Sequence, residues 1–156
     1  MSTLCETLRA SPRELPFEAT HHVRDTCLCL HVQRAARALA RRFDEALRPL
    51  DLTQGQFSLL TSLNRPEPPN VGSVAALLAM DRTTLTANLK PLERRGLVKI
   101  AVDKEDKRGR LLIITAAGRA LVRRAYPVWE REHAETERLL TGVSPDNLRN
   151  TLRALA

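Results

Sequence analysis

Aromatic residues are scarce in this chain of 156 residues, at 3% of the sequence, and long apolar runs are missing. A core of Leu, Val, Ala and Ile without bulky rings favours helices packed on helices over a β-sandwich. No apolar stretch approaches the about 20 residues that a membrane-spanning helix needs. The chain is nevertheless long enough to bury a core of its own.

Cysteine is also rare, and the three cysteines form an odd number. An odd count argues against a disulfide framework and is compatible with a reducing compartment. The first thirty residues contain acids and prolines where a signal peptide would have an apolar middle. We therefore expect a cytoplasmic protein that does not contact a membrane.

Motifs of enzyme chemistry are missing too. The sequence has no nucleophile beside a base at motif spacing, no glycine-rich phosphate loop and no paired carboxylates in an apolar setting. His21, His22, Cys27, Cys29 and His31 are potential zinc ligands, but their spacing matches no compact structural zinc site. We expect a protein that is not an enzyme and that needs no cofactor or metal.

Positive charge, in contrast, is abundant and concentrated. The whole chain has a net charge of +7, and the segment from Arg82 to Arg110 contains nine basic residues against four acidic ones. Most of the excess charge therefore lies in less than a fifth of the chain. Such clustering is typical of a protein that binds a polyanion.

The basic segment begins with a predicted helix. Asp81 is a good N-cap, and Gly96 can end the helix with a positive φ. Leu85, Leu89 and Leu92 recur at helical spacing and predict a buried stripe. The remaining face is short, polar and basic, which suits a helix that enters the major groove of DNA. Pro91 predicts a kink or a loosened last turn, because it lacks an N–H group.

Two short aliphatic runs, 97–102 and 110–114, follow this helix and predict a β-hairpin with a charged tip. A shorter helix, expected from about Ser73 to Met80 with Val74, Leu77 and Leu78 inward, precedes it. Short helix, tight turn and second helix form a helix-turn-helix, and the hairpin adds a wing. The Thr53-x-x-Gln56 pattern predicts a capping box at the start of the helix before these elements.

Long helices are expected at both ends of the chain. One runs from about Glu18 to Leu50, and another begins after Thr115, includes Leu139 and ends at Gly142. Ser144-Pro145 predicts the start of a last helix. We expect a mostly α fold with three parts: an N-terminal arm and first helix (1–50), a winged helix-turn-helix domain (51–115) and C-terminal dimerisation helices (116–156). Their unpaired apolar stripes indicate a homodimer.

Several of these motifs together resemble one family. Asp81-Arg82, the LERRGLV sequence at Leu92 to Val98, the wing residues Asp103, Asp106 and Arg108, and the Ile114-Thr115-x-x-Gly118 ending are similar to the MarR family of winged-helix transcription regulators. The resemblance implies a homodimer, usually a repressor, that binds double-stranded DNA and is released by a small ligand or by oxidation. It also implies that Arg108 enters the minor groove and that Asp106 orients it, with Lys107 and Arg110 as nearby substitutes.

The predicted DNA contacts divide into two groups. The candidates for base or phosphate contacts are Thr83, Thr84, Thr86 and Asn88, and those for phosphate contacts are Arg82, Lys90, Arg94 and Arg95. Two recognition helices related by a two-fold axis would lie about 34 Å apart, so the operator should be a pseudo-palindrome.

The signal that releases the DNA is left open by the sequence. A small aromatic or anionic effector would need apolar walls and a few polar anchors, and the candidates are His31, Arg34, Arg37, Phe43 and Phe57. Alternatively, Cys29 has a spacing similar to that of the sensing cysteine in the organic-hydroperoxide subgroup of the family. Gln33 and Phe43, however, stand where that subgroup has tyrosines. An architectural DNA-binding protein without regulatory input is a further alternative.

Overall fold

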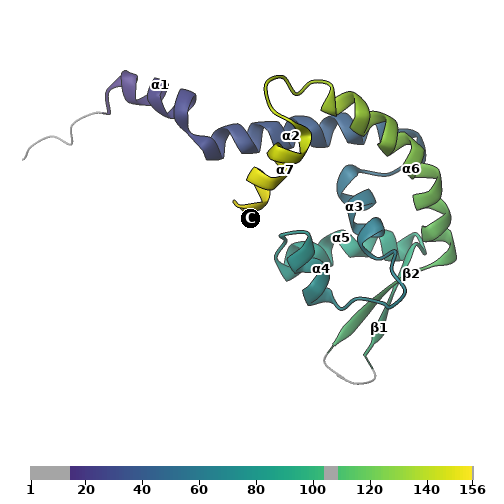
Figure 1. The fold of residues 1–156 in the computed structure, drawn as a ribbon. Coiled ribbons are helices and arrows are strands. Elements are labelled where there is room, and N and C mark those ends of the chain that lie inside the picture. The colour runs from purple at the N-terminus through teal and green to yellow at the C-terminus, as the bar shows by residue number, and fades with distance from the viewer. Residues whose placement is uncertain (1–14, 104–108, 156) are drawn as a thin grey trace, which may run out of the picture. The chain divides into compact units, whose positions relative to one another are not determined.

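The computed structural model describes residues 15–103 and 109–155, and in these ranges the chain is mostly helical with one small β-hairpin (Figure 1). It divides into two compact units, one ending at Arg37 and the other beginning at Ala38. The three parts predicted from the sequence (1–50, 51–115 and 116–156) were defined by their expected roles in dimerisation and DNA binding. That division stays a prediction.

The first unit contains helix α1 (Phe17–Thr26) and the start of helix α2 (Leu28–Leu47). The prediction of one continuous helix from Glu18 to Leu50 is wrong, because the backbone of Cys27 is extended, with φ −69° and ψ 104°. Thr26 donates its hydroxyl proton to the carbonyl oxygen of His22, a local bond that competes with regular helix geometry. α1 has no buried residue, so no packing forces the two helices into one.

In the second unit, α2 ends in a short 3-10 turn, η1 (Arg48–Leu50), and α3 (Gln54–Ser62) follows. The predicted capping box is confirmed: the N–H of Gln56 donates to Thr53 Oγ1 at 3.2 Å, and the N–H of Thr53 donates to Gln56 Oε1 at 3.1 Å. These reciprocal bonds fix where α3 begins.

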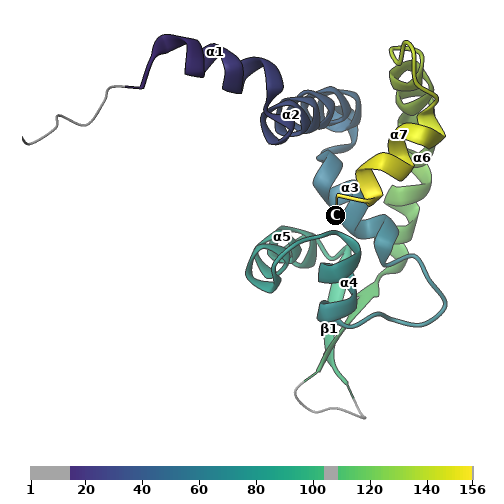
Figure 2. The same cartoon turned by 60° about the vertical axis from the view of Figure 1, so that its left-hand side comes forward.

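Helix α4 (Val71–Leu77) begins earlier than predicted, because Asn70 is its N-cap and accepts the N–H of Ser73 at 2.8 Å. Val74 is buried as expected, but the prediction that Leu77 lies inward is wrong, since its side chain is 62% exposed. The helix ends at Leu77, and Ala79 then turns the chain with a positive φ of 50°. Figure 2 shows α4 beside α5, which it contacts.

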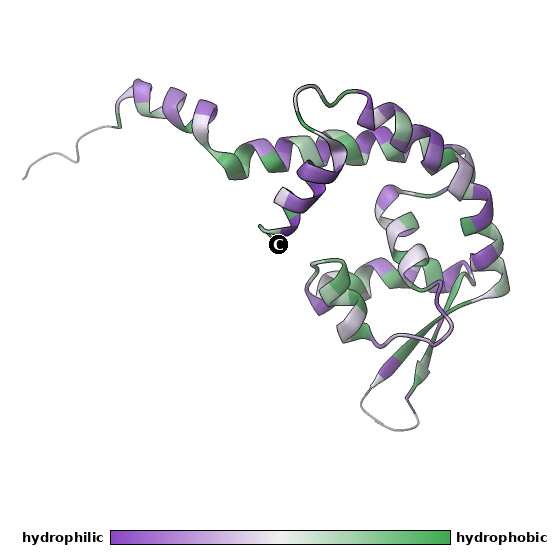
Figure 3. Cartoon of the chain, viewed as in Figure 1, coloured by the Kyte–Doolittle hydropathy of each residue, from purple (hydrophilic) through white to green (hydrophobic). Residues whose placement is uncertain are grey.

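Helix α5 (Arg82–Arg94) continues through Pro91, and the hairpin of β1 (Val98–Val102) and β2 (Arg110–Ile114) follows it. The strands are antiparallel, with Val98 opposite Ile114 and Val102 opposite Arg110. Beside β2, the N–H of Leu112 donates to the carbonyl oxygen of Pro69 at 2.9 Å, which ties the α3–α4 loop to the hairpin. Both strands are largely hydrophobic in colour in Figure 3.

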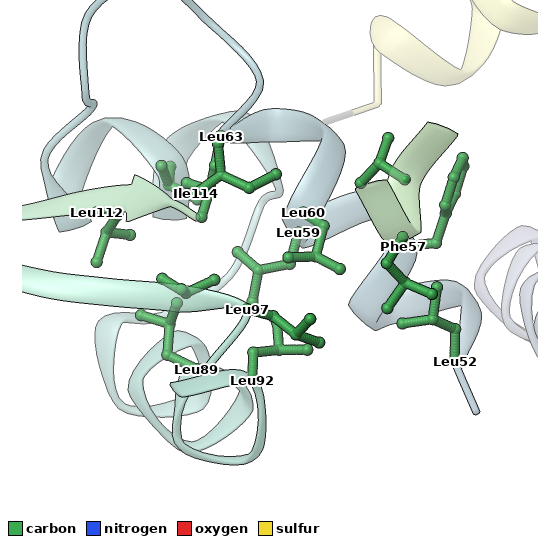
Figure 4. Close-up of a cluster of buried hydrophobic side chains, with 14 of the residues drawn as sticks. Leu52, Phe57, Leu59, Leu60, Leu63, Leu89, Leu92, Leu97, Leu112 and Ile114 are labelled. Atoms are coloured by element: carbon green, nitrogen blue, oxygen red, sulfur yellow. The ribbon is translucent and has the colours of Figure 1, made fainter. Parts of the chain in front are cut away.

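One leucine-rich core holds these elements together (Figure 4). Leu60, Leu85, Leu92 and Leu112, from α3, α5 and β2, are fully buried. The stripe predicted for α5 is therefore confirmed, and it fixes which side of this helix faces away from the core.

Helix α6 (Ala116–Glu137) begins at the predicted N-cap, Thr115, whose Oγ1 accepts the N–H of Gly118 at 3.1 Å. The prediction that α6 includes Leu139 and ends at Gly142 is wrong. The N–H of Leu139 bonds to the carbonyl of Thr136, three residues back, so the last turn tightens, and this leucine is 64% exposed. Helix α7 (Pro145–Arg153) has Ser144 as its N-cap, as predicted.

No helix in the described ranges has the length and hydropathy to cross a membrane.

Candidate nucleic-acid interface

Asp81 fixes the start of α5. Its Oδ1 accepts the N–H of Thr84 at 2.8 Å, and its Oδ2 accepts the Thr84 hydroxyl at 2.6 Å. The hydroxyl bond from Thr84, with smaller contributions from main-chain N–H groups, holds the pKa of Asp81 below its usual value. The carboxylate thus stays charged at the positive end of the helix, and the hydroxyl of Thr84 serves the cap.

The face of α5 opposite the buried leucines is exposed. At 3.6 residues per turn, Thr83, Ala87, Lys90 and Arg94 lie farthest from the core. All of the predicted contact residues around this helix are exposed: Arg82, Thr83, Thr84, Thr86, Asn88, Lys90, Arg94 and Arg95. Their exposure makes them available to a partner, and their contacts with DNA stay a prediction.

One flank of α5 is tied to other parts of the protein. Arg95 Nη1 donates to the carbonyl oxygen of Asp51 at 2.6 Å, and its Nη2 lies 3.4 Å from the Asp51 carboxylate. Asn88 Nδ2 lies 3.8 Å from Met80 Sδ, in the turn before the helix. Arg95 therefore anchors the end of α5 to the turn before α3, a role that the sequence did not suggest.

The other flank faces the base of the hairpin. An open groove of about 490 Å³ lies there, and its lining residues are Asn70, Val71, Gly72, Arg82, Thr86, Asp103, Gly109 and Arg110. Arg110 donates to the carbonyl oxygen of Gly109 at 3.0 Å. Asn70 and Gly72 were not predicted to line this surface. The Asn70-x-x-Ser73 spacing was the signal, since it marks a helix start at the edge of this groove.

Three of the predicted wing residues belong to the segment of sequence between β1 and β2. The N–H of Asp103 donates to the carbonyl oxygen of Gly109 at 3.1 Å, which closes the hairpin below the tip. Asp106, Lys107 and Arg108 lie outside the described residues. Their predicted roles stay predictions.

The residues predicted to bind an effector lie in both units. In the first unit His31, Arg34 and Arg37 are exposed. The side-chain contacts of two of them are local: His31 Nδ1 lies 2.9 Å from the carbonyl oxygen of Cys27, and Arg37 donates to Gln33 at 3.3 Å. In the second unit Phe43 and Phe57 are buried. Within 15–103 and 109–155, no three His, Cys, Asp or Glu residues are grouped so that they could hold a metal.

A cluster of aromatic rings around Trp129 of α6 was not predicted from the sequence. The rings of Trp129 and His133 stack at 4.8 Å, and Trp129 also stacks on Phe57 at 6.2 Å. The tyrosine ring of Tyr126 lies 5.7 Å from the same indole. The spacing of these α6 residues by three and four was the signal that they share a face. Three of the five aromatic residues in the chain are thus together in one place.

A helix-turn-helix of α4 and α5, followed by a two-stranded hairpin, defines a winged helix-turn-helix protein. Comparison with known proteins narrows the class. The model of the MarR family matches residues 52–109. The HTH-type transcriptional regulator TtmR of Methylorubrum extorquens is 33% identical over 120 residues, which are 77% of this chain and 57% of TtmR.

Two solved structures are similar as well. The transcriptional regulator MosR of M. tuberculosis in complex with DNA is 36% identical, with a TM-score of 0.75, over 83% of this chain and 92% of MosR. CouR of Rhodococcus jostii RHA1 bound to p-coumaroyl-CoA is 26% identical, with a TM-score of 0.66, over 84% of this chain and 90% of CouR. The chain belongs to the MarR family. It spans little more than half the length of TtmR.

Proposed function

We propose that this protein is a transcription regulator that binds a pseudo-palindromic DNA operator as a homodimer. The observation that carries the proposal is the exposed polar and basic face of α5, with the hairpin beside it. A helix of 13 residues is about 20 Å long and fits the major groove, which is about 12 Å wide. The DNA-bound relative MosR supports this assignment.

Cationic side chains on this face would bind phosphates. Arg82, Lys90 and Arg94 are exposed along α5, and no ion pair involving them is present in the described ranges. Each phosphate that they neutralise releases condensed counterions, so affinity should fall as the salt concentration rises. A plot of the logarithm of the binding constant against the logarithm of the salt concentration should have a slope of about −0.9 for each contact.

A second copy of the chain would cover apolar side chains that a single chain exposes. In the first unit these include Phe17, Val23 and Leu28, and in the second unit Leu139 and Leu152. A two-fold dimer places its two copies of α5 in successive major grooves, about 34 Å apart. The operator should then contain two inverted half-sites.

The experiment is the selection of bound duplexes from a random DNA pool, followed by gel-shift titration and sedimentation. We expect enrichment of an inverted repeat with half-site centres about one helical turn apart, bound by two chains. Binding of every duplex with equal affinity would instead indicate an architectural protein. A protein that retains no duplex at physiological salt would contradict the proposal altogether.

We also propose that a small aromatic or anionic effector releases the dimer from DNA and so relieves repression. CouR binds p-coumaroyl-CoA, and in this chain Phe57, Trp129 and His133 supply stacked rings. Trp129 is the chain's only tryptophan, so its fluorescence reports on one place. Titration with phenolic acids and their thioesters should change this fluorescence and release DNA at the same concentrations. A compound that releases DNA without changing the fluorescence would place the effector elsewhere.

Thiol oxidation is a second candidate signal, because Cys29 is exposed and its sulfur accepts the Gln33 amide N–H at 3.3 Å. Peroxides oxidise cysteines that are accessible to them, and this side chain is exposed. Organic peroxide should then release DNA from the native protein and not from Cys29→Ser. Equal release from both proteins would exclude Cys29 as the sensor.

A further inference from the structure

The exposed face of α5 contains an open hollow of about 340 Å³. Its lining residues are Arg82, Thr83, Thr86, Ala87 and Lys90. Along the helix the two cationic residues stand at the ends of this set, and the three short side chains lie between them.

The hydroxyl of Thr86 is already committed as a donor. It donates to the carbonyl oxygen of Arg82, one helical turn earlier, at 2.7 Å. A hydroxyl has only one proton, so Thr86 can offer a partner lone pairs and its methyl group but no hydrogen. Ala87 offers a methyl group alone. The centre of the hollow is therefore rich in methyl groups.

This chemistry selects among the base edges of the major groove. Guanine presents two acceptors, N7 and O6, and phosphate oxygens also accept, so none of these atoms can accept a hydrogen bond from the Thr86 hydroxyl, whose proton is engaged. Thymine is the base that presents an apolar group, its C5-methyl, to this groove. A hollow of methyl groups between two cations fits a thymine methyl with phosphates on either side.

We propose that this hollow reads a thymine C5-methyl group in each operator half-site, through Thr86 and Ala87. The inference rests on the proposed function and adds the base that the recognition helix selects. Arg82 and Lys90 bind the flanking phosphates and position the helix.

The test replaces each thymine of the selected operator by deoxyuridine, which removes only the methyl group. At the contacted position affinity should fall about fourfold for each half-site, the effect of removing one buried methyl group from an apolar contact. As a converse test, a G·C pair at the same position should bind more tightly when its cytosine carries a 5-methyl group, because that methyl occupies the same place.

Variants of Thr86 connect this preference to the hollow. Thr86→Val keeps a methyl group and should keep the ratio of thymine to uracil affinity, whereas Thr86→Ser removes the methyl and should bring the ratio towards one. Since the ratio is taken within one variant, a loss of folded protein does not change it. Thr151→Ser on α7, where the hydroxyl makes the same bond to a carbonyl four residues back, is the matched control.

The outcomes separate the two proposals. If uracil at every thymine leaves affinity unchanged while the operator is still bound tightly, the reading of the methyl group is wrong and the proposed function stands. If Thr86→Ser keeps the full preference for thymine, Thr86 is not the reader. If no duplex is retained, both proposals fail.

Discussion

Gly118 lies so close to Leu97 that a Cβ atom placed on the glycine would be 2.3 Å from the carbonyl oxygen of Leu97. Nearby, the hydroxyl of Thr115 lies 2.7 Å from the carbonyl oxygen of Gly96. The first turn of α6 is thus pressed directly against the backbone that enters the hairpin. Only a residue without a side chain permits this approach, which fixes the hairpin relative to the core.

Gly118→Ala should therefore destabilise the protein. The nearest clash is with a main-chain oxygen, and the Ile114 side chain that also clashes is buried, so neither can move away easily and we expect a loss of about 2–3 kcal/mol. Urea denaturation at fixed protein concentration measures it. Gly55→Ala is the control: that glycine is in α3 with nothing within 4 Å, so the same substitution should stabilise by about 0.5–1 kcal/mol. Equal effects at both positions would contradict the close approach.

Asp81 should make the stability of α5 depend on pH. Its pKa is lowered in the folded state, above all by the Thr84 hydroxyl, so its contribution is complete above the unfolded value of about 3.9. The contribution is lost as pH falls through the lower folded-state pKa. Asp81→Asn keeps an oxygen for the cap but does not titrate.

The measurement is the free energy of unfolding of the native protein minus that of Asp81→Asn, from pH 7 to pH 2. We expect a constant difference near neutrality and a decrease only in the acid range. A difference that grows as pH falls would mean that the charged cap destabilises α5.

Features set within a few residues were predictable from the sequence. The caps at Thr53, Asp81, Thr115 and Ser144 all form as predicted, because each depends on one side chain and on a main-chain N–H three residues away. The stripe of leucines on α5 likewise follows from helical period alone. These local rules were enough to place the winged helix-turn-helix.

Features that depend on packing were not predictable. Leu77 has the spacing of a core residue, but α4 ends there and the turn at Ala79 leaves it exposed. The break at Cys27 follows from the absence of any buried contact on α1, which periodicity cannot reveal. Arg95 appeared as one more cation of the basic segment, and its bond to Asp51, far away in sequence, gives it a different role.

Arg94 and Arg95 are adjacent and should behave differently when replaced by alanine. Arg95→Ala removes a partly exposed bond to a main-chain carbonyl, so we expect a loss of stability of about 1 kcal/mol. Arg94 is exposed on the outer face of α5, so Arg94→Ala should leave stability unchanged. It should make the slope of log affinity against log salt concentration shallower by about one unit, the effect of losing one phosphate contact. Two measurements distinguish the two residues: urea denaturation, and gel-shift titration at salt concentrations from about 50 to about 200 mM. A shared phenotype would assign both to the same role.

Ala79 turns the chain between α4 and α5 with a φ of 50°, in the left-handed region that is costly for residues with a Cβ atom. Ala79→Gly removes this cost of about 1–2 kcal/mol, while the greater freedom of glycine in the unfolded chain offsets about 0.4–1 kcal/mol of the gain. We expect a net stabilisation of about 0.5–1 kcal/mol in urea denaturation. Ala120→Gly, at an exposed position inside α6, is the matched control and should destabilise by a similar amount. If both glycines destabilise, the left-handed turn is not a source of strain, and Ala79 is instead favoured by its contacts in the helix-turn-helix.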